Sequence, residues 1–233
     1  MPAVDFKTSV LDLVGDFSDD NALNDFLTAS AREVISVLPP PVLLQNSASE
    51  NWIVSSGFHS IDNKKILEVI RQGYTCKQIP QGKATEAADT NSIFLASARD
   101  PVFYLKAGRA YILPTPTGSD GDSVLITIPQ PSVITTHTAI ANFPDNAEYA
   151  VVLGASAKAL QRMASDVRDE VNKTNGDIAQ FNTFVTTDEE FELGSVQSQL
   201  LQTQIQRFQG YMGQHKTLFE LYQAELQRLS QTQ

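Results

Sequence analysis

The apolar positions near the end of the chain recur as they do on one side of an amphipathic helix. Between residues 195 and 230 the spacing alternates between four and three residues, the heptad pattern of helices that pack along one another. At 1.5 Å per residue, such a helix would span about 54 Å, more than the diameter of a compact domain of this size. We therefore expect one end to project or to pack on a neighbouring molecule. The predicted seam consists of Leu201, Ile205, Phe208, Met212, His215, Phe219, Tyr222, Leu226 and Leu229.

A second heptad-like seam predicts a helix over residues 145–172. Pro144 and Asp145 suit its first turn, and the run Asn172–Gly176 is expected to end it. We expect the two helices to form a hairpin within the chain, and the overhang of the longer one is available to a neighbour. Packing of the C-terminal seam between subunits is the alternative. The seam residues are Tyr149, Leu153, Ser156, Leu160, Met163 and Val167, and a further apolar line of the last helix holds Leu200, Tyr211, Leu218 and Leu221.

The N-terminal part of the chain predicts one long helix over residues 19–38, with a shorter one near residues 6–14. Ser18 or Asp19 can cap the long helix, and Pro39 and the two prolines after it end it. Residues 42–51 are expected to form a polar connector. The apolar positions of the long helix are Leu23, Phe26, Leu27, Ala31, Val34, Ile35 and Leu38.

Residues 52–135 change to short β-branched and aromatic runs, which are typical of strands. The best hairpin signal is the pair of arms on either side of Ala107-Gly108. Of the predicted strands, Lys65–Arg71 could instead be helical. The predicted strands are Trp52–Ser56, Lys65–Arg71, Tyr74–Ile79, Ser92–Ser97, Val102–Lys106, Arg109–Leu113 and Ser123–Ile128.

These elements predict an α+β fold: a helical bundle with a long C-terminal helix plus a small antiparallel β-subdomain. Its parts are an N-terminal helical segment (1–51), the β-subdomain (52–135) and a helical hairpin (136–233), integrated in one structural domain. The acidic stretch 177–194 could be an extended arm, a hairpin or a loop. Its cluster of Asp188, Glu189, Glu190 and Glu192 is expected to be a solvated loop, and alternatively a DNA-repelling lining or a docking arm for a basic partner.

The charge of the chain argues against tight binding of phosphate groups. The 233 residues carry a net charge of −10, and no segment forms a basic patch. Residues 1–50 hold eight acidic and two basic side chains, and residues 145–192 hold ten and four. An acidic wall would repel DNA, which is useful where DNA must slide past without sticking.

The sequence contains no recognisable catalytic or metal-binding motif, so we expect neither an enzyme nor a cofactor. Cys76 is the single cysteine, which excludes an intrachain disulfide and a thiolate cluster, and it is expected to be a small buried hydrophobe. The segment Gly154–Lys158 resembles a serine nucleophile elbow but lacks the second glycine. Thr117–Ser123 is interpreted as a hairpin turn, with a calcium loop as the alternative.

The three histidines, His59, His137 and His215, are scattered along the chain. His215 falls on the predicted seam, where a satisfied, partly buried side chain is expected and a pH switch is the alternative. The N-terminus lacks the pattern of a signal peptide, and no apolar run is long enough to span a membrane. We therefore expect a protein that folds in a cytoplasm and has no membrane partner.

The order of these features resembles structural proteins of tailed bacteriophages, particularly those of marine and cyanobacterial hosts. The residues that carry the resemblance are the hairpin Asp100–Pro116, the strand Ser123–Pro129, the helix start Phe143–Met163 and the Gln-rich run Gln199–Leu226. It covers residues 92–230 and rests on packing patterns. Within that group the chain is most similar to head-to-tail connectors, also called neck adaptors.

The resemblance implies a virion protein, made in the host cytoplasm, that forms a homo-oligomeric and commonly twelvefold ring. Such a ring docks under the portal, receives the tail or nozzle proteins, and lets DNA pass without sequence-specific binding. The alternatives are a tail, baseplate or fibre-attachment ring, or an assembly scaffold or chaperone absent from the mature virion. The residues expected to pack helices or subunits together are Leu153, Leu160, Met163, Leu201, Ile205, Phe208, Met212, Phe219 and Tyr222.

Overall fold

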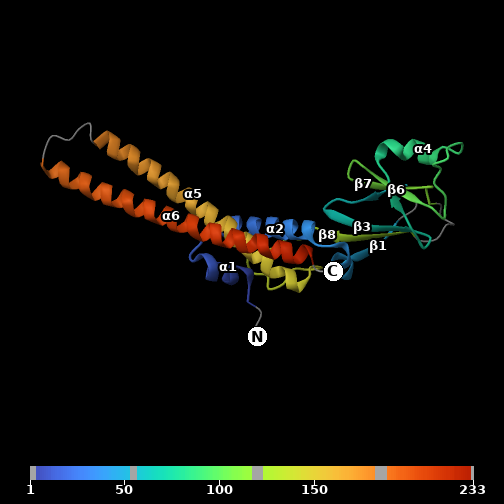
Figure 1. The fold of residues 1–233 in the computed structure, drawn as a ribbon, viewed down its shortest axis with the longest axis horizontal. Helices are drawn as coiled ribbons and strands as arrows, with labels where there is room; N and C mark the ends of the chain where they lie inside the picture. Colours follow the sequence, from blue (N-terminus) through green and yellow to red (C-terminus); the bar gives the residue numbers. More distant parts are fainter. Residues whose placement is uncertain (1–3, 53–56, 117–122, 182–187, 232–233) are drawn as a thin grey trace. The chain divides into compact units, whose positions relative to one another are not determined.

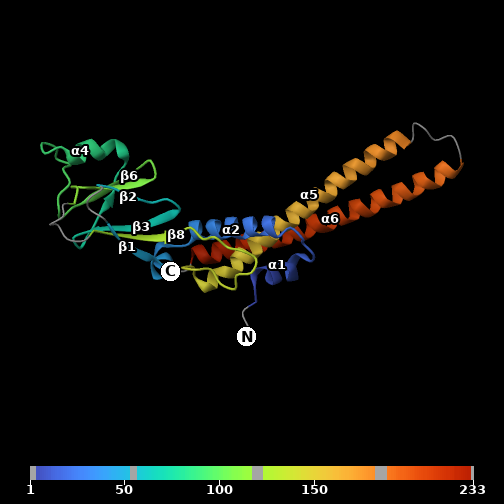
Figure 2. The ribbon, with the colours of Figure 1, turned by 180° about the vertical axis from the view of Figure 1, so that it is seen from behind.

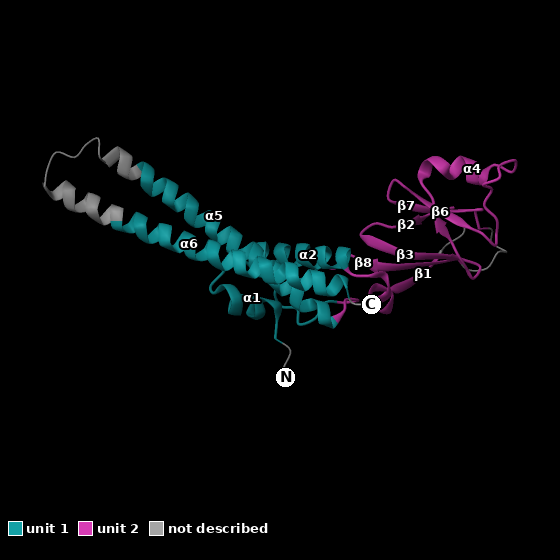
Figure 3. Cartoon of the chain, in the orientation of Figure 1, with its two compact units in different colours: residues 1–37, 132–140, 145–231 teal, residues 38–131, 141–144, 232–233 magenta. Residues whose placement is uncertain are grey.

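The chain combines long helices with two four-stranded sheets, which confirms the α+β class (Figure 1). The computed structural model describes residues 4–52, 57–116, 123–181 and 188–231, with the backbone alone for Trp52, 177–181 and 188–198. The chain divides into two compact units (Figure 3). Unit 1 comprises residues 1–37, 132–140 and 145–231, and unit 2 comprises residues 38–131, 141–144 and 232–233.

Unit 1 is a bundle in which two long helices form a hairpin. The helices α5 and α6 run side by side and continue beyond α1 and α2, as both views of the ribbon show (Figures 1 and 2). The elements of unit 1 are α1 (Phe6–Val14), α2 (Asp20–Val37), a short 3-10 helix (Asp145–Ala147), α5 (Glu148–Phe181) and α6 (Asp188–Ser230).

Both long helices extend further than their sequence patterns predict. The predicted end of α5 at Asn172–Gly176 is wrong, because the helix continues to Phe181. A glycine inside a helix costs about 1 kcal/mol relative to alanine, which packing along a second helix can offset. The predicted start of α6 at residue 195 is also wrong. The acidic residues Asp188 to Glu192 lie in the first turns of α6 and do not form a loop.

The N-terminal helices begin at aspartates, as the sequence predicts for α2. The Asp5 side chain accepts a hydrogen bond from the Thr8 backbone N–H at 2.7 Å. Asp19 accepts one from the Ala22 N–H at 3.0 Å, so Asp19 caps α2. Each such cap satisfies a backbone donor that has no partner inside the helix, which contributes about 1 kcal/mol. The helix α2 ends at Val37, before the prolines.

The core of unit 1 lies where α5 is covered by α1, α2 and α6. Its α2 contribution is Leu23, Leu27, Ala31 and Val34, all fully buried. The segment 132–140 joins α1 to α2 through its backbone. The Phe6 N–H donates to the His137 carbonyl oxygen at 3.0 Å, and the Thr135 N–H donates to Asn24 Oδ1 at 2.7 Å.

Gly154 marks the place where α2, α5 and α6 come closest together. A Cβ atom at this position would lie 2.8 Å from Ser30 Oγ and 3.0 Å from the Tyr222 ring, so only glycine fits. A polar junction surrounds it. Lys158 Nζ donates to Ser30 Oγ at 3.0 Å and to Glu33 Oε2 at 2.8 Å, and the Tyr222 hydroxyl donates to Glu33 Oε2 at 2.9 Å. Burial, together with the Glu33 carboxylate, raises the pKa of Tyr222.

Unit 2 contains two four-stranded sheets, ordered β1-β8-β3-β4 and β2-β7-β6-β5. The helices beside them are α3 (Pro40–Gln45) and α4 (Ala84–Ala88), the latter following a 3-10 turn (Gln81–Lys83). The strands are β1 (Ala48–Trp52), β2 (His59–Ser60), β3 (Lys64–Arg71), β4 (Tyr74–Thr75), β5 (Lys77–Gln78), β6 (Val102–Lys106), β7 (Arg109–Leu113) and β8 (Ser123–Pro129).

The two sheets of unit 2 enclose one apolar core. Val69 and Leu125 from the first sheet pack with Phe103, Ala110 and Ile112 from the second, together with Cys76. Outside the second sheet, a smaller cluster of Ala87, Ala96 and Val102 packs under α4. The opposite faces of strand β6 therefore serve two different cores, because its side chains alternate.

The predicted hairpin at Ala107-Gly108 is confirmed. Lys106 pairs with Arg109 across a two-residue turn in which both central residues have positive φ, 48° and 70°. This conformation is typical of a type I′ turn, whose twist matches that of the strands. The predicted strand Lys65–Arg71 is also confirmed, within β3.

Several predictions for unit 2 are wrong. The polar connector at 42–51 contains the end of α3 and the strand β1. The segment Ser92–Ser97 is not a strand, and Tyr74–Ile79 is split at Cys76, whose N–H donates to the Val69 carbonyl. The β-subdomain is not purely antiparallel, because β5 runs parallel to β6. Residues 53–56 of a predicted strand and residues 117–122 of the predicted turn lie outside the described residues.

We expect Gly154→Ala to lower the free energy of unfolding by about 1–3 kcal/mol, because the added methyl group must displace Ser30 and Tyr222. Gly176→Ala is the matched control in the same helix. No atom lies within 4 Å of its Cβ position, so this change should stabilise the protein by up to about 1 kcal/mol. Urea unfolding followed by circular dichroism measures both. Equal effects of the two substitutions would contradict the close approach at Gly154.

Candidate functional site

The buried face of α6 follows a heptad line along α5. Every seventh residue from Leu201 to Leu229 is half-buried or buried, with Tyr222 at 5% and Leu229 at 1% exposure. The positions three residues after each member of this line are covered as well. The covered face therefore comprises Leu201, Gln204, Phe208, Tyr211, His215, Leu218, Tyr222, Glu225 and Leu229.

Four residues of the predicted α6 seam lie outside this covered face: Leu226, which is half-buried, and three that are exposed. Ile205, Met212 and Phe219 are 38%, 43% and 42% exposed. Because they are seven residues apart, they share one side of the helix, and we call them the open row. The sequence predicts that the residue four positions after each member of the line Leu201–Leu229 is buried. In the structure, the residue three positions after each member is covered instead. The heptad members themselves, Leu201, Phe208 and Tyr222, are covered to differing degrees.

The predicted seam residues of α5 lie inside the bundle. Leu153 and Leu160 are buried, and Met163 is half-buried. Tyr149, at the start of the predicted α5 seam, is 56% exposed and does not belong to the covered face. Since α1, α2 and α6 all pack on α5, the apolar side chains described between Ala150 and Val171 are used within the chain and form no open row.

The open row borders a small hollow between α2, α5 and α6. The rings of His215 and Phe219 stack at 5.8 Å between centroids and 12° between planes. The hollow has a volume of about 180 Å³ and contains the Lys158–Glu33 ion pair at its floor. Its lining consists of Glu33, Gly154, Ala157, Lys158, Gln161, His215, Phe219 and Tyr222. His215 is therefore partly buried against a ring, as the sequence predicts.

The surface of α6 around the open row carries little net charge. Between residues 199 and 231 it has three basic residues, Arg207, Lys216 and Arg228, and two acidic ones, Glu220 and Glu225. Arg228 and Glu225 neutralise each other at 2.6 Å. The whole chain has a net charge of −10. Two copies would repel each other over most of their surfaces, but this face adds little to that repulsion.

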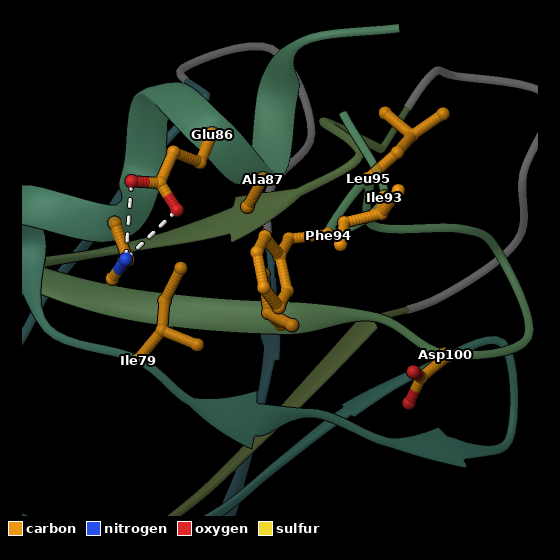
Figure 4. A pocket seen from close by; sticks show the side chains of 9 residues that line it. Ile79, Glu86, Ala87, Ile93, Phe94, Leu95 and Asp100 are labelled. Carbon is orange, nitrogen blue, oxygen red and sulfur yellow. Dashed lines mark hydrogen bonds and ion pairs between the residues drawn. The ribbon is translucent and has the colours of Figure 1, made fainter. Parts of the chain in front are cut away.

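Unit 2 holds a second apolar surface, beside α4. The side chains of Ile93, Phe94 and Leu95 are 92%, 64% and 44% exposed and follow one another in a loop. They line a pocket of about 400 Å³ together with Ile79 and Val102, and Figure 4 shows Phe94 and Ile79 at this pocket. Three consecutive exposed apolar side chains form an apolar patch, a type of surface found at many interaction sites.

The charged groups of this pocket are already paired. Lys83 Nζ lies 2.9 Å from Glu86 Oε2 and 5.7 Å from the centre of the Phe94 ring (Figure 4). Asp100 is paired with Lys77 at 2.7 Å. A carboxylate paired with a neighbouring lysine is a poor general base, and the lining contains no Ser, Thr, Cys or His side chain. The exposed side chains of the pocket offer mainly apolar contact.

Other residues considered for chemistry are accounted for by packing. Cys76 is buried, and burial raises the pKa of its thiol to about 11, so it is a structural residue as predicted. Within the part of the chain that the structure describes, no group of three His, Cys, Asp or Glu side chains could hold a metal ion. Among the same residues, no helix is both long and apolar enough to cross a membrane.

Comparison with known proteins gives no family assignment. No family profile matches the chain, and no curated protein shows significant sequence similarity to it.

Two features of the surface differ from what the sequence alone indicates. The sequence predicts the open row as part of a seam. On a helix, the positions three and four residues after a heptad position lie on opposite sides of it, so the pattern alone does not show which of the two is covered. The run Ile93–Leu95 was predicted as a strand, because β-branched and aromatic residues favour strands. The signal in the sequence that this run lies in a loop is the pair of polar segments around it, Asp89–Ser92 and Ser97–Asp100.

We expect Phe208→Asp and Met212→Asp to separate folding from surface contact. Phe208 is partly covered by α5, so a carboxylate there should lower the free energy of unfolding by about 2–5 kcal/mol. Met212 is 43% exposed, so its replacement should change that free energy by less than about 1 kcal/mol. Urea unfolding at low protein concentration measures both variants. Losses of similar size would show that Met212 belongs to the chain's own core.

Proposed function

We propose that this protein is a structural subunit of a tailed-phage virion that assembles into a ring connecting the portal of the head to the tail. The observation that carries the proposal is the open row on α6, an apolar helix face with heptad spacing that α5 leaves uncovered. A subunit whose task is to hold others in a ring needs such a face. An isolated globular protein gains nothing from exposing it.

The energetics favour another helix as the covering element. Apolar side chains at heptad spacing fit a second helix laid along the first, which covers the whole row at once. Burying the remaining surface of the row contributes at about 25 cal/mol per Å². A permanent ring needs a large interface, about 2,000 Å² or more, so the row would be the centre of a wider contact along the hairpin.

Charge favours a second copy of this chain as the partner. Copies with a net charge of −10 repel one another, so they associate best through a face with few charges. The part of α6 around the open row, residues 199–231, is such a face, because its three basic and two acidic residues nearly cancel, whereas the acidic residues of α6 lie mainly in its first turns. Glutamine and threonine dominate its remaining positions, and these can form neutral hydrogen bonds at an interface.

The connection to a phage neck comes from the sequence. The hairpin at Asp100–Pro116, the strand after it and the start of α5 resemble structural proteins of tailed phages. An acidic protein without a basic patch also suits a channel through which DNA slides without binding. The charged groups of the unit 2 pocket are paired, so that pocket adds no argument for a catalytic role.

The test is the mass of the purified protein by native mass spectrometry, alone and with the portal of the same phage, and its presence in purified virions. We expect a closed ring, formed either alone or on the portal, and a band of this protein in mature particles. A trimer or hexamer indifferent to the portal would indicate a tail or fibre component. Absence from mature virions would indicate a scaffold or chaperone.

Met212→Asp supplies the variant for this assay, with Asn172→Asp as its control. The first places a charge in the open row, whereas the second adds the same charge at an exposed position of α5. We expect the first to remain monomeric at concentrations where the wild type and the control form rings. Rings of Met212→Asp at the wild-type concentration would remove the support that the open row gives to the proposal.

A further inference from the structure

A second surface of α6 is hollowed where two glycines face outward. The hollow has a volume of about 480 Å³ and lies between α6 and Leu13 of α1. A Cβ atom at Gly210 or Gly213 would meet no atom within 4 Å, so the hollow exists because these side chains are missing. We call it the glycine hollow. Its lining is uncharged and consists of Leu13, Gln209, Gly210, Gly213, Gln214, Thr217 and Leu218.

The glycine hollow and the open row lie on opposite flanks of the face that α5 covers. A helix turns by roughly 100° per residue, so Met212 and Gly210 point in nearly opposite directions. The neighbouring helices agree with this assignment. Phe219 of the open row borders the hollow that contains Glu33 of α2, whereas the glycine hollow is bordered by Leu13 of α1.

The two surfaces also lie at the same height along α6. Met212, the middle of the open row, stands between Gly210 and Gly213 in the sequence. With a rise of 1.5 Å per residue, the protruding side chain and the gap are separated along the helix axis by only about 1.5–3 Å.

We infer that Met212 of one copy inserts into the glycine hollow of the next copy, so that the α6 helices of adjacent subunits pack in parallel around the ring. The inference rests on the proposed function, which makes a second copy the partner. A rotation about an axis parallel to α6 keeps every residue at its height, so it brings Met212 of one subunit opposite Gly210 and Gly213 of the next. Two different patches in contact give a head-to-tail interface, the kind that closes into a ring.

The chemistry of the two surfaces is complementary. Methionine is flexible and polarizable, so it fills an irregular gap without a fixed shape. The hollow carries no charge that would lose its hydration on contact, and the amides of Gln209 and Gln214 remain at its rim for hydrogen bonds. A charged ligand would find no counter-ion in the hollow. A small apolar molecule would fill the gap but leave the open row uncovered.

Cysteine cross-linking tests the contact directly. In a Cys76→Ala background, which has no other cysteine, the double variant Met212→Cys/Gly210→Cys is oxidised and run on a denaturing gel. The two cysteines point to opposite sides of α6 and cannot bond within one chain. We expect a ladder of dimers, trimers and higher species, because each subunit links to two neighbours. Each single variant should give no ladder, since a head-to-tail contact does not place a residue against itself.

A filled hollow provides an independent test. Gly213→Leu places a side chain in the gap from a Cβ position that has no atom within 4 Å and no strained backbone, and Gly176→Leu starts from an equally open Cβ position on α5. We expect Gly213→Leu to raise the protein concentration at which half of the subunits assemble by tenfold or more. Gly176→Leu should leave it unchanged, and circular dichroism should show both variants folded.

The outcomes separate the inference from the proposed function. If the wild type forms rings but Gly213→Leu assembles equally well, the inference is overturned and the proposed function stands. Cross-linking by the single variants as strongly as by the double variant would overturn it too, because it would indicate like-to-like contact. No ladder from the double variant, either free or bound to the portal, would also overturn it. A wild type that forms no ring under either condition defeats the proposed function itself.

Discussion

The close approach of three helices at Gly154 determines how the rest of unit 1 is arranged. The Tyr222 ring lies against this glycine, and its hydroxyl donates to Glu33 on α2, which also accepts a hydrogen bond from Lys158 on α5. A side chain held at both its ring and its hydroxyl can adopt one orientation only. This contact therefore fixes the rotation of α6 about its own axis, and with it the choice of the face that α5 covers.

That rotation leaves a polar group inside the bundle, which shows that α6 is positioned by specific contacts as well as by burial of apolar area. On α6, the side-chain oxygen Gln204 Oε1 is buried and has no hydrogen-bond partner among the described residues. Such an unsatisfied group costs about 1–3 kcal/mol. A free choice of rotation would bury Ile205 in place of Gln204. The junction at Gly154 outweighs this preference, and the apolar row consequently stays on the surface.

The sequence predicts the elements of this fold better than it predicts their faces. The helix α2, the hairpin at Ala107-Gly108 and the strand β3 all follow from local pattern and turn chemistry. The rotation of α6 does not, because apolar residues occur both three and four positions after the heptad line, and only the tertiary contact at Tyr222 decides between them. The extension of α5 past Gly176 and the loop at Ile93–Leu95 likewise depend on what packs nearby, which local propensity does not contain.

The distribution of charge gives this arrangement a mechanical consequence. A chain with a net charge of −10 repels its copies, and salt screens that repulsion at separations beyond about 8–10 Å. Attraction through an apolar row acts only at contact. In the proposed ring, copies would therefore associate where the nearly neutral flanks of α6 meet in register, and acidic surfaces would oppose other encounters. The proposed ring, which would form once, with one geometry and around a polyanion, would benefit from that combination more than from a stronger but less selective apolar surface.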